Sequence, residues 1–233
     1  MSSSETEGNI FRRYNAESPI ATELRRLYSN LRRQSKDNNY RSFLITSSRR
    51  GEGKSTITSY LAVTIAQFSN RRVLVVDADL RRPRIHSIFG LKNQSGLLEC
   101  LSGAAEPLSV VKKTELENLD VITAGGATTE PSRYLESDLL SELFEKVKFY
   151  YDIVLVDSAP VLAVSDTLFL GAESDAVLLV VLAGATPRDV VVRARDTLSD
   201  ANMNLIGVLV NNVSEVLPYY YDYKYYGAYK EMK

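Results

Sequence analysis

The sequence predicts an α/β fold with a mostly parallel central sheet flanked by helices, and three observations support this class. Short apolar runs typical of buried parallel strands alternate with segments of helical periodicity along the chain. A Gly-rich turn ending in Gly-Lys-Ser joins the first apolar run to a helix. Polar residues follow several apolar runs, at the strand ends where such sheets bind ligands.

The composition is that of one folded domain with tails. The chain has 233 residues, a formal net charge of −1 and 45% hydrophobic residues, which is enough for a sizeable core. No apolar run approaches the roughly 18 residues of a membrane span, and no secretion signal opens the chain. The single cysteine, Cys100, excludes an internal disulfide framework. We therefore expect a cytoplasmic protein, and we expect no nucleic-acid partner.

Three regions are expected along the chain: a flexible N-terminal tail (1–17), a folded domain (18–217) and a tyrosine-rich C-terminal tail (218–233). The domain begins with a helix over 18–34, because Ser18 suits an N-cap and Pro19 suits a first helical turn. Apolar residues recur in it at helical spacing, at Ile20, Leu24, Leu27 and Leu31.

The early part of the chain is basic, since residues 11–50 hold ten Lys or Arg and three acids. This excess fits either a solvated helix face with phosphate neutralisation, or contact with a partner subunit or anionic lipid.

The remaining elements alternate, which predicts right-handed crossovers and a mostly parallel sheet. Strands are expected at 41–46, 73–76, 119–122, 153–156, 176–182 and 205–210. Helices are expected at 57–67, 131–148, 165–170 and 187–200, with a loop at 35–39 and mixed helix and loop over 84–118.

The turn at 47–56 has the layout of a phosphate-binding P-loop. Its small residues allow backbone N–H groups to surround a polyphosphate, and the following helix directs its positive end at the same anion. Ser48 stands where the usual pattern G-x-x-x-x-G-K-[ST] has its first glycine. Lys54 adds a full charge, and the Ser55 hydroxyl can bind Mg²⁺. The predicted nucleotide-binding residues here are Ser48, Gly51, Glu52, Gly53, Lys54, Ser55 and Thr56.

Three aspartates follow two of the strands. Asp77 and Asp79 lie two apart, so an extended backbone would direct both from one face, and Asp157 follows another strand. An aspartate at a strand end can simply start a turn, but three converging on a P-loop favour a site for Mg-ATP. We predict Ser55, Asp77 and Asp157 as Mg²⁺ ligands. The predicted catalytic residues are Lys54, Asp77, Asp79 and Asp157.

At these motifs the chain resembles the bacterial tyrosine kinases of capsule and exopolysaccharide systems. The loop at 51–56, the D-x-D-x-R at 77–81 and the strand ending in Asp157 look like their three Walker-type motifs, and the resemblance runs from about Ser18 to the end. Where the family usually has D-T-P-P, this chain has D-S-A-P. The resemblance implies a P-loop NTPase fold of the deviant Walker A, partitioning ATPase-like type, with adenine contacted by Asn211.

The same resemblance implies a non-specific protein-tyrosine kinase that phosphorylates itself between subunits of a homo-oligomer and regulates polysaccharide synthesis and export. It further implies a separate transmembrane activator that recruits the kinase to the inner face of the plasma membrane, and a cognate tyrosine phosphatase. Two features depart from the family. Its E-x-x-R-x-x-R helix motif aligns with Thr22, Arg25 and Tyr28, or in a shifted alignment with Glu23, Arg26 and Ser29. Arg49 and Arg50 replace a stretch that often contains proline.

The C-terminal tail supplies a candidate acceptor, because seven of the 14 tyrosines lie within residues 219–229. A phenol has a pKa of about 10, so attack near neutral pH is helped by a carboxylate that takes its proton. Asp79 is the first candidate for this base and Asp77 the second. The predicted phosphorylation sites are Tyr219, Tyr220, Tyr221, Tyr223, Tyr225, Tyr226 and Tyr229.

Two other functions remain open at this point. A partitioning or positioning ATPase has the same fold, but such proteins carry a second lysine five positions before Lys54, where this chain has Arg49, and they lack a tyrosine-rich tail. A non-catalytic adaptor could bind ATP only to assemble on a membrane partner. The presence of Lys54 together with all three aspartates argues against the adaptor.

Overall fold

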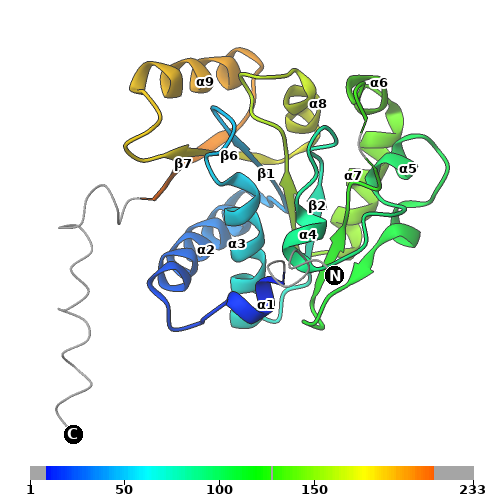
Figure 1. The fold of residues 1–233 in the computed structure, drawn as a ribbon, viewed down its shortest axis with the longest axis horizontal. Coiled ribbons are helices and arrows are strands. Elements are labelled where there is room, and N and C mark those ends of the chain that lie inside the picture. Colours follow the sequence, from blue (N-terminus) through cyan, green and yellow to red (C-terminus); the bar gives the residue numbers. More distant parts are fainter. Residues whose placement is uncertain (1–8, 127, 213–233) are drawn as a thin grey trace, which may run out of the picture.

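The computed structural model describes residues 9–126 and 128–212. These residues form a seven-stranded sheet between two layers of helices (Figure 1), with strand order β3-β4-β2-β5-β1-β6-β7. All neighbouring strands are parallel except the short pair β3 and β4. The strands are β1 (Ser42–Ser47), β2 (Val73–Asp77), β3 (Lys112–Lys113), β4 (Leu119–Ile122), β5 (Ile153–Asp157), β6 (Ala176–Leu182) and β7 (Leu205–Asn211).

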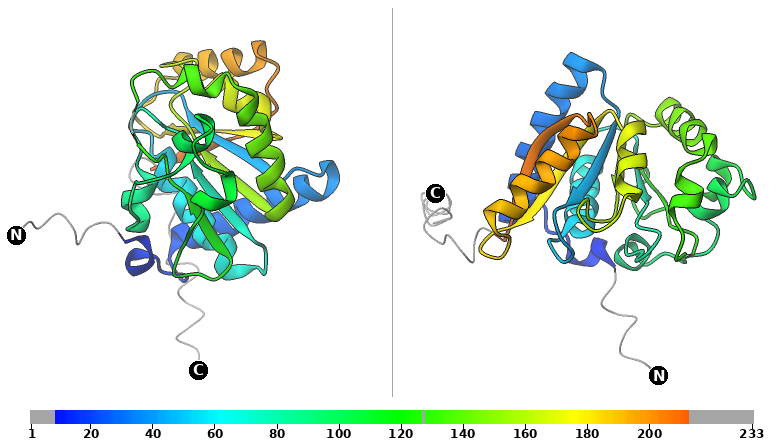
Figure 2. Two further views of the ribbon diagram at one scale, coloured as in Figure 1. Left: turned by 90° about the vertical axis from the view of Figure 1, so that its right-hand side faces the viewer. Right: turned by 90° about the horizontal axis from the view of Figure 1, so that it is seen from above.

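The helices divide between the two faces of the sheet (Figure 2). One face packs against α1 (Ile10–Arg13), α2 (Pro19–Asn38), α3 (Lys54–Phe68) and α4 (Ile85–Phe89). The other packs against α5 (Leu97–Leu101), η1 (Pro107–Val110), α6 (Ser132–Leu135), α7 (Asp138–Tyr150), α8 (Asp166–Glu173) and α9 (Arg188–Asp200). Because successive strand residues face opposite sides, Leu44 joins one core while Phe43 and Ile45 join the other.

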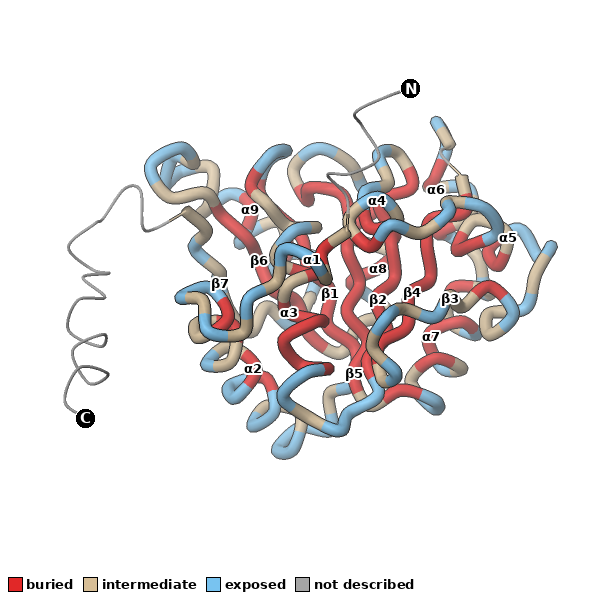
Figure 3. The backbone as a smooth tube through the Cα atoms, turned by 60° about the horizontal axis from the view of Figure 1, so that its bottom comes forward, coloured by how far each residue is buried: buried red, intermediate tan, exposed pale blue. Residues whose placement is uncertain are grey.

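The central strands are buried on both faces, which explains their continuous apolar sequences. Every residue of β1, β2 and β5 is buried (Figure 3). The edge strand β7 differs, since Val208 and Val210 are 45% and 55% exposed. The predicted α/β class and mostly parallel sheet are therefore confirmed.

Several predicted boundaries were wrong. The helix expected over 131–148 is two helices, α6 and α7, separated at Glu136 and Ser137. The two-residue strand β3 was not predicted, because two lysines give no periodic pattern. The helix predicted over 18–34 is α2, which continues to Asn38 through the expected loop at 35–39. It ends where Asn39 adopts a left-handed conformation with a φ angle of 58°.

The expected N-terminal tail is ordered over much of its length. Ile10 in α1 is 1% exposed, and the ring of Phe11 meets that of Phe89 edge-on at 5.8 Å. The Tyr14 hydroxyl is hydrogen-bonded to the Thr64 hydroxyl at 2.9 Å. These three apolar or aromatic side chains give residues 10–14 enough buried contact to pack on α3 and α4, so the prediction of a loose tail was wrong for this part.

The buried stripe of α2 is rotated from the one expected. Ser18 caps the helix as predicted, accepting a hydrogen bond from the Ala21 N–H at 3.2 Å, but Ile20 is 60% exposed. The buried residues are Ala21, Leu24, Tyr28 and Leu31. Tyr28 therefore belongs to the core, whereas Arg26 and Ser29 are exposed and Glu23 is partly exposed.

Among the described helices, none is long and apolar enough to cross a membrane. The predicted phosphorylation sites at 219–229 lie outside the described residues.

Candidate functional site

The predicted site residues converge at the carboxyl ends of three adjacent strands. Asp77 at the end of β2 is in register with Asp157 at the end of β5, and Asp157 is in register with Ile45 of β1. The P-loop follows β1 directly and leads into α3, whose first residue is Lys54. The sheet order thus brings together motifs that lie far apart in sequence.

The P-loop backbone has the conformation that its glycines permit. Gly51 and Gly53 have φ angles of +87° and +90°, a region that other residues rarely adopt. The loop is fixed from within, because the Ser47 hydroxyl donates to the Arg49 carbonyl at 2.8 Å. Ser48 is 1% exposed, and its Oγ has no hydrogen-bond partner within the described residues. Thr56 is exposed in the first turn of α3.

Glu52 holds the shape of the loop from inside. It is 3% exposed, and its carboxylate accepts hydrogen bonds from the Arg49 N–H at 2.7 Å and from the Thr186 hydroxyl. Its carbonyl accepts a hydrogen bond from the Asn211 side-chain amide at 3.0 Å. That amide also lies where a Cβ on Gly53 would be, so any other residue at position 53 would overlap it. Nucleotide contacts by Glu52 and Asn211 stay predictions.

Lys54 is surrounded by acids and hydroxyls. Its Nζ lies 2.9 Å from Asp79 Oδ2, 3.4 Å from Ser55 Oγ and 4.0 Å from Asp157 Oδ1. Burial by itself lowers the pKa of Lys54, but the carboxylates of Asp157 and Asp79 outweigh it and raise that pKa above its ordinary value. The ammonium therefore stays charged at neutral pH.

The carboxylates of Asp77 and Asp157 are buried and incompletely bonded. Asp77 Oδ2 accepts hydrogen bonds from the N–H groups of Arg84 and Ile85, at 3.1 and 2.9 Å. Asp77 Oδ1 and both oxygens of Asp157 have no hydrogen-bond partner within residues 9–126 and 128–212, although both side chains are 0% exposed. Unpaired buried oxygens are rare and costly, and the occurrence of three of them on two neighbouring carboxylates points to a ligand.

The pKa values of Asp77 and Asp157 are both raised, which agrees with the unpaired oxygens of their carboxylates. Burial raises the pKa of Asp157 to about 6, although Lys54 and the Ser55 hydroxyl act in the opposite direction. Burial and the neighbouring Asp157 raise the pKa of Asp77 well above its ordinary value. The raised pKa values show that the two adjacent buried carboxylates lack sufficient neutralising positive charge. A divalent cation bound between them would supply that charge, as a proton does.

The residues present fit magnesium in the way nucleotide sites usually bind it. In the described part of the chain, no group of three His, Cys, Asp or Glu side chains is arranged to hold a metal ion. Mg²⁺ prefers oxygen ligands and keeps waters, so two carboxylates, a Ser hydroxyl and phosphate oxygens suffice. The open oxygens of Asp77 and Asp157 beside Ser55 match this requirement.

One part of the site was not predicted from the sequence. Arg81 donates to both oxygens of the buried Asp166, from Nε at 2.7 Å and Nη2 at 3.2 Å, and from Nη1 to the Thr129 carbonyl at 3.2 Å. The Ser132 hydroxyl also donates to Asp166, at 2.8 Å. These bonds fix the segment that carries Asp79 against α8 and the 129–132 loop. An Asp at the start of a helix is common, so position 166 carried no signal of this role.

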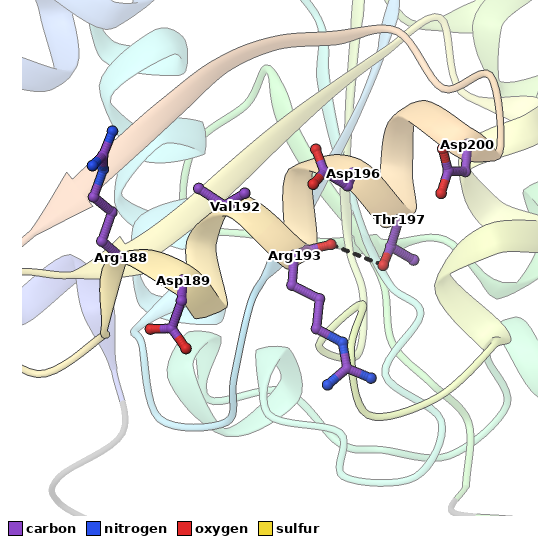
Figure 4. A pocket seen from close by; sticks show the side chains of 7 residues that line it. All are labelled: Arg188, Asp189, Val192, Arg193, Asp196, Thr197 and Asp200. Carbon is purple, nitrogen blue, oxygen red and sulfur yellow. Dashed lines mark hydrogen bonds between the residues drawn. The ribbon is translucent and has the colours of Figure 1, made fainter.

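A shallow depression of about 810 Å³ lies elsewhere, along the outer side of α9 (Figure 4). It contains none of the P-loop residues and none of the three aspartates. Its lining is Arg188, Asp189, Val192, Arg193, Asp196, Thr197 and Asp200. This mixed-charge surface has no features of a nucleotide site.

Comparison with known proteins agrees with the geometry. A family model described as an AAA domain matches residues 41–188. Tyrosine-protein kinase YwqD of Bacillus subtilis is 33% identical over 97% of this chain and 94% of its own length. Putative tyrosine-protein kinase CapB of Staphylococcus aureus is 31% identical over 90% of this chain and 91% of its own.

Solved structures give the same result. The kinase domain of Escherichia coli tyrosine kinase ETK superposes with a TM-score of 0.79 at 31% identity, covering 91% of this chain and 87% of that one. The septum site-determining protein MinD of Pyrococcus horikoshii, complexed with Mg-ADP, has a TM-score of 0.63 at 23% identity, which shows the fold alone. With its P-loop, its paired buried aspartates and relatives that match nearly end to end, the chain belongs to the bacterial tyrosine-protein kinases.

Proposed function

We propose that this kinase transfers the γ-phosphoryl group of ATP to tyrosines of the C-terminal tail, mainly between subunits. The observation that carries the proposal is the set of unpaired buried oxygens on Asp77 and Asp157, beside the charged Lys54 at the end of a P-loop. Such a site is prepared for a metal-bound triphosphate. The acceptor is proposed because seven tyrosines follow the folded domain at 219–229.

The geometry supports a set of proposed ligand contacts. The phosphates would lie on the backbone of the loop at 48–56, with Lys54 neutralising charge on the transferred group. Ser55, Asp77 and Asp157 would hold Mg²⁺, which when bound offsets charge on the phosphate oxygens. Asn211 would contact adenine. Its amide donates to the Glu52 carbonyl at 3.0 Å, so an adenine contact by the same N–H group would compete with that bond.

In the transfer step, the tyrosine oxygen forms a bond to the γ-phosphorus while the bond from that phosphorus to the β,γ-bridging oxygen breaks. ADP leaves with the electron pair, and the phenolic proton passes to a carboxylate. We propose Asp79 as this base, because it is 6% exposed whereas Asp77 is fully buried. Asp79 Oδ1 accepts a hydrogen bond from the Arg82 N–H at 3.1 Å. The ion pair of Asp79 with Lys54 orients its carboxylate.

The cellular role is proposed from the relatives. The relatives include putative tyrosine-protein kinases CapB and EpsB, and the resemblance of the motifs to the kinases of capsule and exopolysaccharide systems supports a role in regulating polysaccharide synthesis and export. We propose recruitment to the inner face of the plasma membrane by a separate transmembrane activator, with no nucleic-acid partner. A homo-oligomer would form through Arg26 and Ser29, which are exposed on α2, and the partly exposed Glu23. A cognate tyrosine phosphatase would reverse the modification.

Intact-mass spectrometry tests this function. The chain is incubated with ATP and Mg²⁺, with and without the cytoplasmic segment of its membrane partner. Steps of about 80 Da that map to residues 219–229 are expected. Lys54→Met should remove these mass steps. The matched variant Lys36→Met, which changes an exposed lysine of α2, should retain them.

The other outcomes separate the alternatives. ADP release with no gain in mass would identify a partitioning-type ATPase. Absence of both, with the activator present, would favour a non-catalytic adaptor. A phosphotyrosine signal that persists in Lys54→Met would contradict autophosphorylation.

A further inference from the structure

Three exposed arginines belong to two segments, the P-loop and the start of α9, that are both hydrogen-bonded to Glu52. Arg49 and Arg50 stand at the entrance of the P-loop, and Arg188 is the first residue of α9. Within residues 9–126 and 128–212, no side-chain hydrogen bond or ion pair of these three arginines is found. The other two charged groups of the loop differ, because Lys54 is paired with Asp79 and Glu52 is buried.

The three arginines share one structural junction. Glu52 lies at its centre, bonded to the Arg49 N–H, to the Thr186 hydroxyl two residues before Arg188, and to the Asn211 amide. Asn211 ends β7, so the polypeptide leaves the sheet next to the P-loop of its own subunit. We name this set of contacts the Glu52 junction.

The junction separates the charges of the Arg-Arg-Gly-Glu sequence. The carboxylate of Glu52 is buried and accepts two hydrogen bonds, whereas the side chains of Arg49 and Arg50 are exposed. A Cβ at Gly51, which separates Arg50 from Glu52, would meet no atom within 4 Å, so the space beside Gly51 is open. Asp189 follows Arg188 at one end of the α9 depression (Figure 4), but no ion pair joins the two. The outer surface of the junction is therefore cationic.

We infer that Arg49, Arg50 and Arg188 form a binding site for phosphotyrosine of the C-terminal tail. Guanidinium groups bind phosphate dianions through paired, charge-assisted hydrogen bonds, and arginine clusters are the usual recognition element for phosphorylated peptides. Asn211 is bonded to the Glu52 carbonyl, and Tyr219 follows Asn212 by seven residues in the sequence. Seven extended residues reach up to about 25 Å, enough to return to the junction of the same subunit.

The proposed site rests on the proposed autophosphorylation, and gives it a product-sensing step. An unmodified tyrosine carries no charge at neutral pH, whereas each phosphotyrosine carries about −1.5 to −2. The site would therefore bind phosphotyrosine, the product, more tightly than unmodified tyrosine, the substrate. A retained phosphotyrosine at the loop entrance would lie in the path of the next acceptor, so phosphorylation would slow further transfer.

A synthetic peptide measures this binding without any kinase reaction. The full chain carrying Lys54→Met keeps its own tail unmodified, and a labelled peptide of residues 217–229 with phosphotyrosine at two positions is titrated by fluorescence anisotropy. We expect the phosphopeptide to bind at least about tenfold more tightly than its unmodified form. Arg49→Gln with Arg50→Gln, and separately Arg188→Gln, should remove most of this difference.

The controls separate this site from general charge and from the nucleotide site. Arg195→Gln changes an exposed α9 arginine that is paired with Asp196, and should leave phosphopeptide binding unchanged. Equal binding by the arginine variants and the parent would overturn the proposal, as would equal binding of a scrambled phosphotyrosine peptide. A parallel loss of Mg-ADP affinity in otherwise native Arg49→Gln/Arg50→Gln would assign these arginines to the nucleotide instead. Because the peptide is made chemically, failure of autophosphorylation would leave this test intact.

Discussion

Buried aspartates occur at both ends of the central sheet, and they differ in the partners of their carboxylates. Asp120 lies near the amino end of β4 and is 3% exposed; its Oδ2 accepts hydrogen bonds from Tyr151 Oη and Lys113 Nζ, each at 2.8 Å, while its Oδ1 has no partner among the described residues. Asp157 lies at the carboxyl end of β5, is fully buried, and accepts no hydrogen bond from the described residues. Its nearest cation, Lys54, is 4.0 Å away.

The difference separates a structural acid from a functional one. A buried carboxylate that serves the fold has a cation and a hydrogen-bond donor in direct contact, as Asp120 has in Lys113 and Tyr151, because an unpaired charge costs stability. A carboxylate that serves a ligand must keep its oxygens open, and the folded protein tolerates that cost until the ligand arrives. The Tyr151 hydroxyl illustrates the first case, since burial and the bond to Asp120 raise the pKa of this phenol far above its ordinary value and keep it a donor.

The largest expected effect comes from Asp157→Asn. Loss of one metal-binding charge should reduce phosphoryl transfer by roughly two orders of magnitude or more. The metal-free variant should be at least as stable at pH 7 as the parent, because a buried charge without a hydrogen-bond partner has been removed. Initial rates of tail phosphorylation and a urea unfolding curve measure the two quantities. A clear loss of stability would show that Asp157 is structural after all.

The pH dependence of stability gives a second, smaller contrast. In the metal-free protein the pKa of Asp157 is about 6, against 3.8 as its ordinary value, so the folded state binds the proton more tightly. Its contribution to stability is therefore present below about pH 4 and is lost as the pH rises through about 6, by on the order of 1–3 kcal/mol. The Asp157→Asn variant should not show this loss of stability. The unfolding free energies of the parent and the variant should therefore differ in their pH dependence. Identical profiles over pH 4–7 would contradict the raised pKa.

Asp120→Asn should show the smallest effect and the opposite pattern. It weakens the charge-assisted bond from Lys113 and should lower the free energy of unfolding by about 1–2 kcal/mol. Phosphorylation per folded molecule should not change, since Asp120 is remote from the P-loop along β4. Chemical denaturation with a parallel activity assay checks both statements. If activity fell while stability held, the distinction between the two ends of the sheet would fail.

Much of this fold could be predicted because its strands are buried on both faces. Continuous apolar runs such as 153–156 and 176–182, each bounded by polar residues, are typical of buried parallel strands, and the P-loop fixes the direction of the first crossover. The convergence of Lys54, Asp77, Asp79 and Asp157 could be predicted for the same reason, since parallel strands end at one edge. Their roles stay predictions. α1 could not, because four helical residues with one buried isoleucine resemble a polar tail until α3 and α4 are in place.

The inner role of Glu52 was also beyond sequence reasoning. Its position in the loop suggests a nucleotide contact, and only the tertiary fold brings Thr186 and Asn211 against it. The pairing of Arg81 with Asp166 is similar, since 85 residues separate the two. Side-chain bonds between distant loops leave no periodic trace in a sequence, whereas strands and caps do.

The bond between Asn211 and the Glu52 carbonyl also limits where the chain can be shortened. Asn211 is the last residue of an edge strand whose Val208 and Val210 are half exposed, yet its amide holds the loop that surrounds the phosphates. A tail-free form of the enzyme must therefore retain Asn211, and a cut a few residues earlier would release the loop together with the strand. For the same reason, a reporter domain attached directly after residue 212 would lie at the mouth of the active site, whereas one attached before α1 would leave that mouth open.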